Sequence, residues 1–126
     1  TREDLAGYYS HITALDRCFG RLLRALEANH ISEDTLVVFT SDHGDMLGSQ
    51  GQRLKRKPWE ESINVPCILR YPRRLKGGRK ADTIFTHVDF APTLMGLCGL
   101  RPGADMQGAD LSAALVGKGC SCRVSR

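Results

Sequence analysis

Two neighbouring residues, Asp42 and His43, are the most specific candidates for chemistry in this sequence. They follow an apolar run, Thr35 to Thr40, so a carboxylate and an imidazole are expected together at the end of a strand. Oxygen ligands suit calcium, magnesium or manganese, and an imidazole nitrogen shifts the preference toward manganese, iron or zinc. Two ligands do not complete a site, since even calcium takes about six or more oxygens. The pair therefore predicts either a metal site or a hydrogen-bonded strand end.

Further polar side chains follow in a glycine-rich loop and beyond it. Lys55 and Lys57 have the charge to hold an anionic ester group, although isolated lysines are more often solvated surface residues. Glu60 and Glu61 are candidate acid/base groups, with structural hydrogen bonds or surface charge as the simpler interpretation. His87 is a candidate ligand or base, and a hydrogen-bonded histidine is its default interpretation.

The length and composition indicate one small globular domain. The chain has 126 residues, 41% hydrophobic and 25% charged, and no stretch approaches the roughly 18 apolar residues of a membrane span. Its net charge of +4 comes largely from two basic stretches, Arg53 to Lys57 and Arg70 to Lys80. Tyr71 is the only aromatic residue in the second stretch, which favours a solvated loop over a nucleic-acid surface. An anionic small substrate would suit the first.

The cysteine count is odd, which argues against a disulfide framework. Three of the five stand among apolar residues, where Cys behaves as a small buried hydrophobe. The last two form a C-x-C pair without a second pair at zinc-finger spacing, so their role stays open. The five are Cys18, Cys67, Cys98, Cys120 and Cys122.

The elements that must position these residues alternate between helix and strand. The strongest periodic pattern predicts a helix over about Glu3 to Ala28, with Asn29 and His30 near its end. Its apolar residues recur at steps of three and four: Leu5, Tyr8, Ile12, Leu15, Phe19, Leu22 and Leu26. The runs Thr35 to Thr40 and Val65 to Tyr71 predict strands, the first buried on both faces. This order gives an α/β fold class.

The last third of the sequence predicts shorter elements. A short strand is expected at Thr83 to Val88, then a helix from about Ala91 to Cys98. Asp89 would cap that helix, Pro92 would lie in its first turn, and Gly99 would end it. A short helix is expected at Leu111 to Val116, and residues 117–126 form an irregular tail.

Four blocks of the sequence resemble the sulfatase family of the alkaline phosphatase superfamily. They are Tyr8 to Leu26, Thr35 to Asp45, Trp59 to Pro72, and His87 to Leu94 with Gly99, Gly108 and Leu111. The blocks stand in the family's order and cover nearly the whole chain. The resemblance implies that residues 1–116 are the C-terminal portion of the catalytic domain. It also implies part of a three-layer sandwich with a mainly parallel central sheet, incomplete in this chain.

The resemblance also implies a mechanism and ligands. Sulfatases bind one divalent cation, usually calcium, with manganese or zinc as alternatives, and hydrolyse sulfate esters of small molecules or glycans. Asp42 matches the family's carboxylate ligand, and His43 stands where the family carries Asn, Gln or His. Lys55 matches a lysine that binds sulfate oxygens, with Lys57 as a less certain substitute. Neither a nucleic acid nor a membrane span is implied.

Two departures from the family pattern bear on activity. The nucleophile, a Cys or Ser in a Cys-x-Pro-x-Arg pattern converted to formylglycine, is absent, so no residue is assigned as catalytic. The paired N-terminal aspartates of the metal site are absent too, and Asn64 stands where relatives often carry Arg. We therefore expect a fragment that lacks the N-terminal part of the domain, exposes apolar surface and is inactive alone. The alternatives are a phosphonate monoester or phosphodiester hydrolase of the same superfamily, and a non-catalytic remnant.

Overall fold

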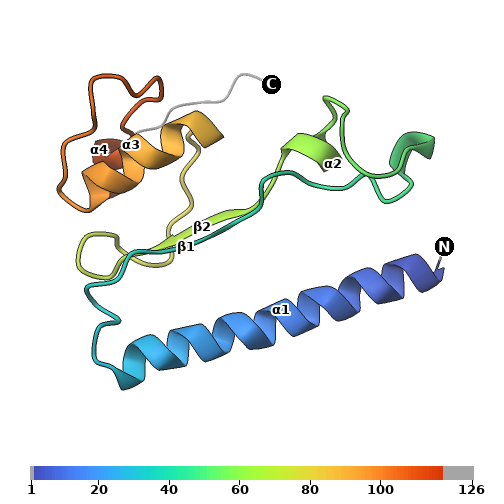
Figure 1. Cartoon of the computed structure of the whole chain (residues 1–126), viewed down its shortest axis with the longest axis horizontal. Helices are drawn as coiled ribbons and strands as arrows, with labels where there is room; N and C mark the ends of the chain where they lie inside the picture. Colours follow the sequence, from blue (N-terminus) through green and yellow to red (C-terminus); the bar gives the residue numbers. More distant parts are fainter. Residues whose placement is uncertain (1, 118–126) are drawn as a thin grey trace. The chain divides into compact units, whose positions relative to one another are not determined.

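The helices and strands fall into two compact units that divide between Ile68 and Leu69. A computed structural model describes residues 2–117 of the chain (Figure 1). The predicted tail at residues 117–126, with Cys120 and Cys122, lies outside the described residues from position 118 onward. The elements are α1 (Arg2–Ala28), β1 (Val37–Thr40), the 3-10 turn η1 (Ser49–Gly51), α2 (Glu60–Ile63), β2 (Cys67–Arg70), α3 (His87–Leu97) and α4 (Ser112–Val116).

The first unit begins with the long predicted helix. Helix α1 starts at Arg2 and ends at Ala28, as its periodicity predicts. Its end is closed by His30, which adopts a left-handed conformation with φ 55°. The amides of His30 and Ile31 then donate to the carbonyls of Glu27 and Leu26, at 3.0 and 3.1 Å. This double hydrogen bond is the Schellman pattern, with a histidine where a glycine is usual.

The apolar face of α1 is largely uncovered in the residues that the structure describes. Phe19 packs its ring edge-on against Phe39 of β1, with 5.2 Å between centroids. No residue of α1 is buried, however. The remaining large side chains of the face are exposed: Leu5, Tyr8, Ile12, Leu15 and Leu22. The expectation of exposed apolar surface is therefore confirmed within residues 2–117.

Strands β1 and β2 pair in a two-stranded sheet. Strand β1 is shorter than its apolar run because the Thr35 hydroxyl donates to the carbonyl of Ile31, at 2.7 Å, and so belongs to the turn after α1. All four residues of β1 are only half-buried, so the prediction of burial on both faces is wrong for this chain. The reason is that a two-stranded sheet offers too few neighbours to cover both faces.

The prediction that three cysteines are buried is also wrong. Cys18, Cys67 and Cys98 are free thiols, and all three are exposed rather than buried. Their local sequences are apolar, but burial requires a second surface against those sequences. Neighbouring residues still shield Cys67 from part of the solvent, and this desolvation raises the pKa of its thiol.

In the second unit, α3 begins one turn earlier than predicted, at His87, and the strand expected at Thr83 to Val88 does not form: residues 83–86 have no regular structure. Thr86, not Asp89, is the N-cap, because Thr86 and Asp89 form a capping box. The Asp89 carboxylate accepts from the Thr86 hydroxyl at 2.6 Å and from the Thr86 amide at 3.1 Å. The earlier start also places Pro92 in the second turn, where it is buried. Gly99, at φ 77°, ends the helix as predicted.

Helix α3 carries most of the packing in this unit. Leu97 and Thr93 are fully buried. The Thr93 hydroxyl donates to the carbonyl of Ala109 at 3.2 Å and accepts from the amide of Leu111 at 3.0 Å. These bonds hold the chain just before α4, which forms where a short helix was predicted. Among the described helices, none combines the length and apolarity needed to cross a membrane.

Candidate functional site

Asp42 and His43, the predicted metal ligands, lie just after the end of β1. The Ser41 hydroxyl donates to the carbonyl of His43 at 2.7 Å, and the His43 amide donates to the Asp42 carboxylate at 3.0 Å. Polar side chains at a strand end commonly satisfy the backbone in this way, and the bonds hold Asp42 and His43 in a tight turn. The Asp42 side chain is 80% exposed, so its carboxylate is open to ligands.

A glycine fixes this turn against α2. The amide of Gly44 donates to the carbonyl of Ser62 at 2.8 Å, and Ser62 is buried. A Cβ atom at Gly44 would lie 2.0 Å from the carbonyl oxygen of Glu61, so no other residue fits without moving the backbone. Glycine is therefore required here for close approach, and it couples the Asp42–His43 turn to α2.

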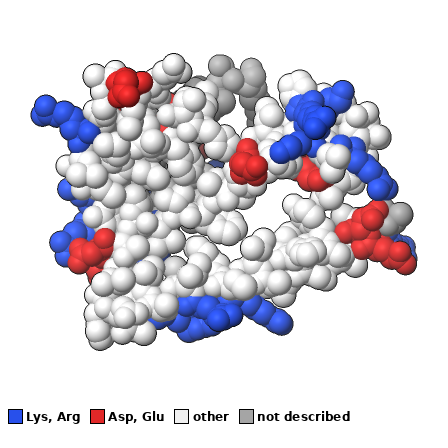
Figure 2. All heavy atoms as spheres, in the orientation of Figure 1, with Lys and Arg blue, Asp and Glu red and all other residues white. Residues whose placement is uncertain are grey.

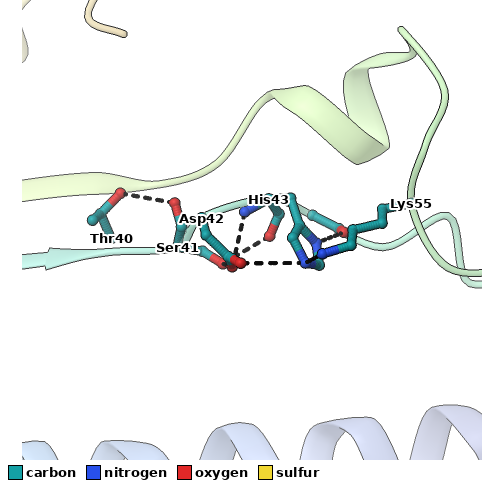
Figure 3. Close-up of polar contacts among 6 residues, drawn as sticks. Thr40, Ser41, Asp42, His43 and Lys55 are labelled. Carbon is teal, nitrogen blue, oxygen red and sulfur yellow. Dashed lines mark hydrogen bonds and ion pairs between the residues drawn. The ribbon is translucent and has the colours of Figure 1, made fainter. Parts of the chain in front are cut away.

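The ring of His43 joins the strand end to the loop that follows it. Its Nδ1 atom contacts the Gly44 carbonyl at 2.7 Å, a contact in which only an N–H makes a hydrogen bond. This assigns the proton of the neutral ring to Nδ1 and leaves a lone pair on Nε2. Lys55 Nζ lies 2.5 Å from Nε2, and Asp42 Oδ2 lies 3.4 Å from it. Figure 3 shows Asp42 and Lys55 both directed toward this ring.

Backbone conformations on either side of Lys55 are unusual. Leu54 has φ 63° and Arg56 has φ 84°, in the left-handed region that disfavours residues with a Cβ atom. Each such residue costs about 1–2 kcal/mol. The Leu54 carbonyl accepts from the amide of Met46 at 2.8 Å, and Met46 is almost completely buried. The core of the first unit thus holds Lys55 in a strained loop, a feature that is concentrated at functional sites.

The electrostatics of the turn favour an ionised carboxylate at Asp42. Partial desolvation acts to raise the pKa of Asp42, but hydrogen bonds from the backbone amides of the turn and the charge of Lys55 lower it. An ionised, exposed carboxylate is a suitable ligand for a hard cation.

The other predicted residues do not join this cluster. Lys57 makes no hydrogen bond or ion pair within residues 2–117. The carboxylate of Glu60 accepts from the Asn64 side chain at 2.8 Å, and that of Glu61 accepts from the Ser49 hydroxyl. The Ser49 bond lowers the pKa of Glu61, which suits a structural carboxylate better than a general acid. His87 lies in the second unit, with its ring stacked on Phe90.

The direct contact between His43 and Lys55 is a spatial relationship that the sequence pattern does not show. The two residues stand twelve positions apart, and no periodicity links them. The clustered glycines of the intervening loop indicate only a loop, without the direction in which it folds.

The donor atoms fit a cation but do not surround it. Asp42 offers an ionised carboxylate and His43 a ring nitrogen with its lone pair free of a proton, and the two atoms are close enough to share one ion. No group of three or more His, Cys, Asp or Glu residues suited to a metal occurs within residues 2–117. The described residues therefore offer two candidate donors, fewer than any common divalent site uses.

The chain matches the model of a known family. The family model described as Sulfatase matches residues 1–100, which include the whole first unit, part of the second, and the Asp42–His43–Lys55 cluster. The chain belongs to the sulfatase family. Its fold is accordingly that of the alkaline-phosphatase-like sulfatases, an α/β architecture of which this chain holds a part.

Similar proteins include several named sulfatases. The chain is 40% identical over 117 residues to an ulvan-active sulfatase of Formosa agariphila, covering 89% of this chain and 22% of that protein. It is 39% identical over 118 residues to an N-acetylglucosamine-6-O-sulfatase of Bacteroides thetaiotaomicron, covering 94% of this chain and 21% of that protein. The sulfatase chain thus spans about a fifth of the length of these relatives.

Solved structures show the same relationship. One structure, in complex with its substrate D-glucosamine-2-N,6-O-disulfate, matches with a TM-score of 0.80 and 40% identity over 86% of this chain and 22% of its own. The phosphonate monoester hydrolase of Agrobacterium radiobacter matches with a TM-score of 0.78 and 31% identity over 90% of this chain and 23% of its own. Both reactions therefore occur on this fold.

Proposed function

We propose that this chain supplies part of the active site of a sulfuric ester hydrolase. Asp42 and His43 serve as two ligands of a divalent cation, and Lys55 binds oxygens of the sulfate group. The observation that carries this proposal is the contact of Lys55 with His43, 2.5 Å from Nζ to Nε2, beside the exposed Asp42 carboxylate. It supports the proposal because a cationic side chain lies next to two candidate metal ligands within a sulfatase-family chain.

The bound cation, calcium in preference to manganese or zinc, would supply Lewis-acid stabilisation of the sulfate oxygens and of the leaving group. The chain's own residues hold and orient the reacting group. The carboxylate of Asp42 and the Nε2 atom of His43 would hold the ion, and the contact of Gly44 with α2 fixes their turn. Lys55 contributes a point charge to the sulfate, and the strained backbone of its loop directs it there.

The nucleophile is not among these residues. The sequence carries no Cys-x-Pro-x-Arg or Ser-x-Pro-x-Arg pattern, and the described residues offer only two candidate metal ligands. We therefore propose that the chain alone does not hydrolyse esters and that hydrolysis needs a segment with the formylglycine precursor. Such a segment is the N-terminal part of the domain.

The substrate that we propose is a sulfate ester of a glycan. The similar proteins include one named for ulvan and one named for N-acetylglucosamine 6-O-sulfate, and a solved relative is bound to a disulfated glucosamine. A phosphonate monoester is the second candidate, supported by the match to the Agrobacterium hydrolase. A non-catalytic remnant is the third interpretation.

Turnover by the protein as its natural source makes it tests this proposal. Its intact mass is determined first, and 4-nitrophenyl sulfate is then compared with a phenylphosphonate monoester at equal concentrations with calcium present. Faster release from the sulfate ester supports the sulfatase assignment, and faster release from the phosphonate overturns it in favour of the second candidate. Absence of turnover together with absence of calcium binding would leave a remnant whose Asp42, His43 and Lys55 are idle.

A further inference from the structure

The two basic stretches of this chain use their charges differently. In the second stretch, arginine side chains hold helix ends. Arg74 donates to the carbonyl of Gly96 in α3 at 3.4 Å. Arg79 donates to the carbonyls of Leu115 and Gly117, at 3.2 and 2.7 Å, at the end of α4. Arginines that satisfy the last carbonyls of a helix complement its dipole, so these two charges have a structural role.

In the first stretch, Arg53 to Lys57, two of the four charged side chains make no structural contact within the described residues. Arg53 forms an exposed ion pair with Asp4 at 3.6 Å, and Lys55 contacts His43. Arg56 and Lys57 are exposed and make no hydrogen bond or ion pair with any residue between 2 and 117. Figure 2 shows the gathering of basic side chains over the loop between η1 and α2.

The same loop holds no opposing charge. Between Asp45 and Glu60 the sequence contains four basic residues and not one Asp or Glu. Like charges at neighbouring positions repel one another, which makes such a cluster unfavourable unless an anion offsets it. The left-handed backbone at Arg56, φ 84°, adds a conformational cost at the same place. The unbalanced positive charge and the left-handed backbone occur together where Arg56 and Lys57 make no structural contact with the described part of the chain. This combination indicates a ligand.

The charge of the proposed reacting group does not account for Arg56 and Lys57. A sulfate monoester carries one negative charge, and Lys55 together with a divalent cation already exceeds it. Consecutive Cα atoms lie about 3.8 Å apart, so the side chains of Lys55, Arg56 and Lys57 extend from positions within reach of substituents on one sugar residue. A second acidic group on the same molecule would match the two remaining charges.

We infer that Arg56 and Lys57 form a second anion-binding subsite beside Lys55, which selects sulfate esters that carry an additional acidic group. This inference rests on the proposed function, because Lys55 marks where the reacting sulfate binds. The subsite distinguishes multiply charged glycans from singly sulfated ones through electrostatic attraction, which is strongest at low salt.

Binding of two sugars to the chain, measured by titration calorimetry with calcium present, tests the inference. The sugars are N-acetylglucosamine 6-sulfate and glucosamine 2-N,6-O-disulfate. We expect the disulfate to bind about tenfold more tightly, which is the effect of one good charged contact. Replacement of both cations, R56Q with K57Q, should reduce this ratio to about two or less. It should change the affinity for the monosulfate by less than about twofold.

A matched control removes two lysines from the other basic stretch. Lys76 and Lys80 are exposed, and the K76Q/K80Q pair changes net charge by the same amount. This control should keep the tenfold ratio, which excludes a general effect of net charge. If the R56Q/K57Q protein unfolds at a lower temperature, R56N is used instead, because Asn tolerates the left-handed conformation at this position.

The outcomes separate this inference from the proposed function. Equal affinity of the unmodified chain for the two sugars overturns the second subsite, and so does a ratio that survives in R56Q/K57Q. A Lys55→Met variant that keeps full affinity for the monosulfate contradicts the sulfate-binding role of Lys55 instead. A 6-sulfated sugar that also carries a uronic carboxylate tests which acidic group the subsite accepts. If it binds as tightly as the disulfate, the subsite accepts any acidic group. If it binds no more tightly than the monosulfate, the subsite requires a second sulfate.

Discussion

The Lys55 ammonium lies 2.5 Å from His43 Nε2, the ring nitrogen that carries the lone pair. One lone pair cannot serve an ammonium proton and a divalent cation at the same time. Metal binding at His43 therefore requires Lys55 to leave the ring, which frees its charge for an anion. Under the proposed function, Lys55 and the cation would therefore compete for His43 while both bind the sulfate.

This competition predicts opposite effects of one substitution. Lys55→Met should raise the affinity of the chain for calcium or manganese about threefold, because a nearby positive charge and a competing donor are removed. The same variant should lose about tenfold in affinity for a sulfate monoester. Titration calorimetry measures both. Lys57→Met is the matched control and should change the cation affinity by less than twofold, since Lys57 has no contact with the ring.

The assignment of Asp42 as a metal ligand predicts a selective loss of cation binding. Asp42→Asn removes the negative charge and should lower the affinity for manganese more than tenfold. Asp45→Asn is the control in the same turn, because the Asp45 carboxylate accepts from the amide of Leu47 at 2.8 Å and is not in the cluster. Manganese binding followed by electron paramagnetic resonance gives the readout. Equal losses in the two variants would refute a specific role for Asp42.

The close approach at Gly44 predicts a loss of stability. In a Gly44→Ala variant the new methyl group would meet the Glu61 carbonyl, so the turn and α2 must move apart. We expect a decrease of about 1–3 kcal/mol in the free energy of unfolding, measured in urea. Gly77→Ala has open space around the new Cβ atom and should change the free energy by less than about 0.5 kcal/mol. Similar values for both would mean that the turn is not tightly packed on α2.

The capping box predicts a pH dependence in the second unit. Hydrogen bonds from the Thr86 hydroxyl and from the amides of Ala109 and Thr86 lower the pKa of Asp89. A lowered pKa in the folded state means that this stabilisation is complete above the ordinary pKa, near pH 4. It is lost as the pH falls through the folded value. Asp89→Asn should therefore destabilise the chain at pH 7, and the difference should shrink toward pH 3.

Urea unfolding at pH 7, 5 and 3 measures this difference. Asp82→Asn is the control, because Asp82 is exposed and makes no hydrogen bond or ion pair within residues 2–117. Its effect should be small at every pH. A constant deficit of Asp89→Asn across the range would show that the carboxylate charge does not strengthen the cap.

The uncovered face of α1 predicts self-association of the isolated chain. Leu15 and Leu22 are 60% and 64% exposed, and they lie on one apolar stripe. Replacement of both with Gln should lower the apparent mass toward the monomer value of 13.9 kDa in light scattering. Arg17→Gln, in the same helix but outside the stripe, should leave the mass unchanged. Identical masses for all three proteins would show that another surface causes association.

The sequence by itself determined the local elements and the identity of the candidate ligands. The spacing of apolar residues fixed α1, and the glycine at position 99 fixed the end of α3, because periodicity and left-handed caps are properties of neighbouring residues. The placement of Asp42 and His43 at a strand end follows from the same local pattern. Their roles as ligands remain a prediction.

Only the tertiary structure decided which distant residues meet. The contact of His43 with Lys55 and the approach of Gly44 to Glu61 depend on how a loop closes, and a sequence pattern does not specify its path. Burial was also beyond the sequence: Cys18 and Cys67 stand in apolar segments, yet both are exposed. An apolar segment can be buried, but burial requires a second surface that packs against it.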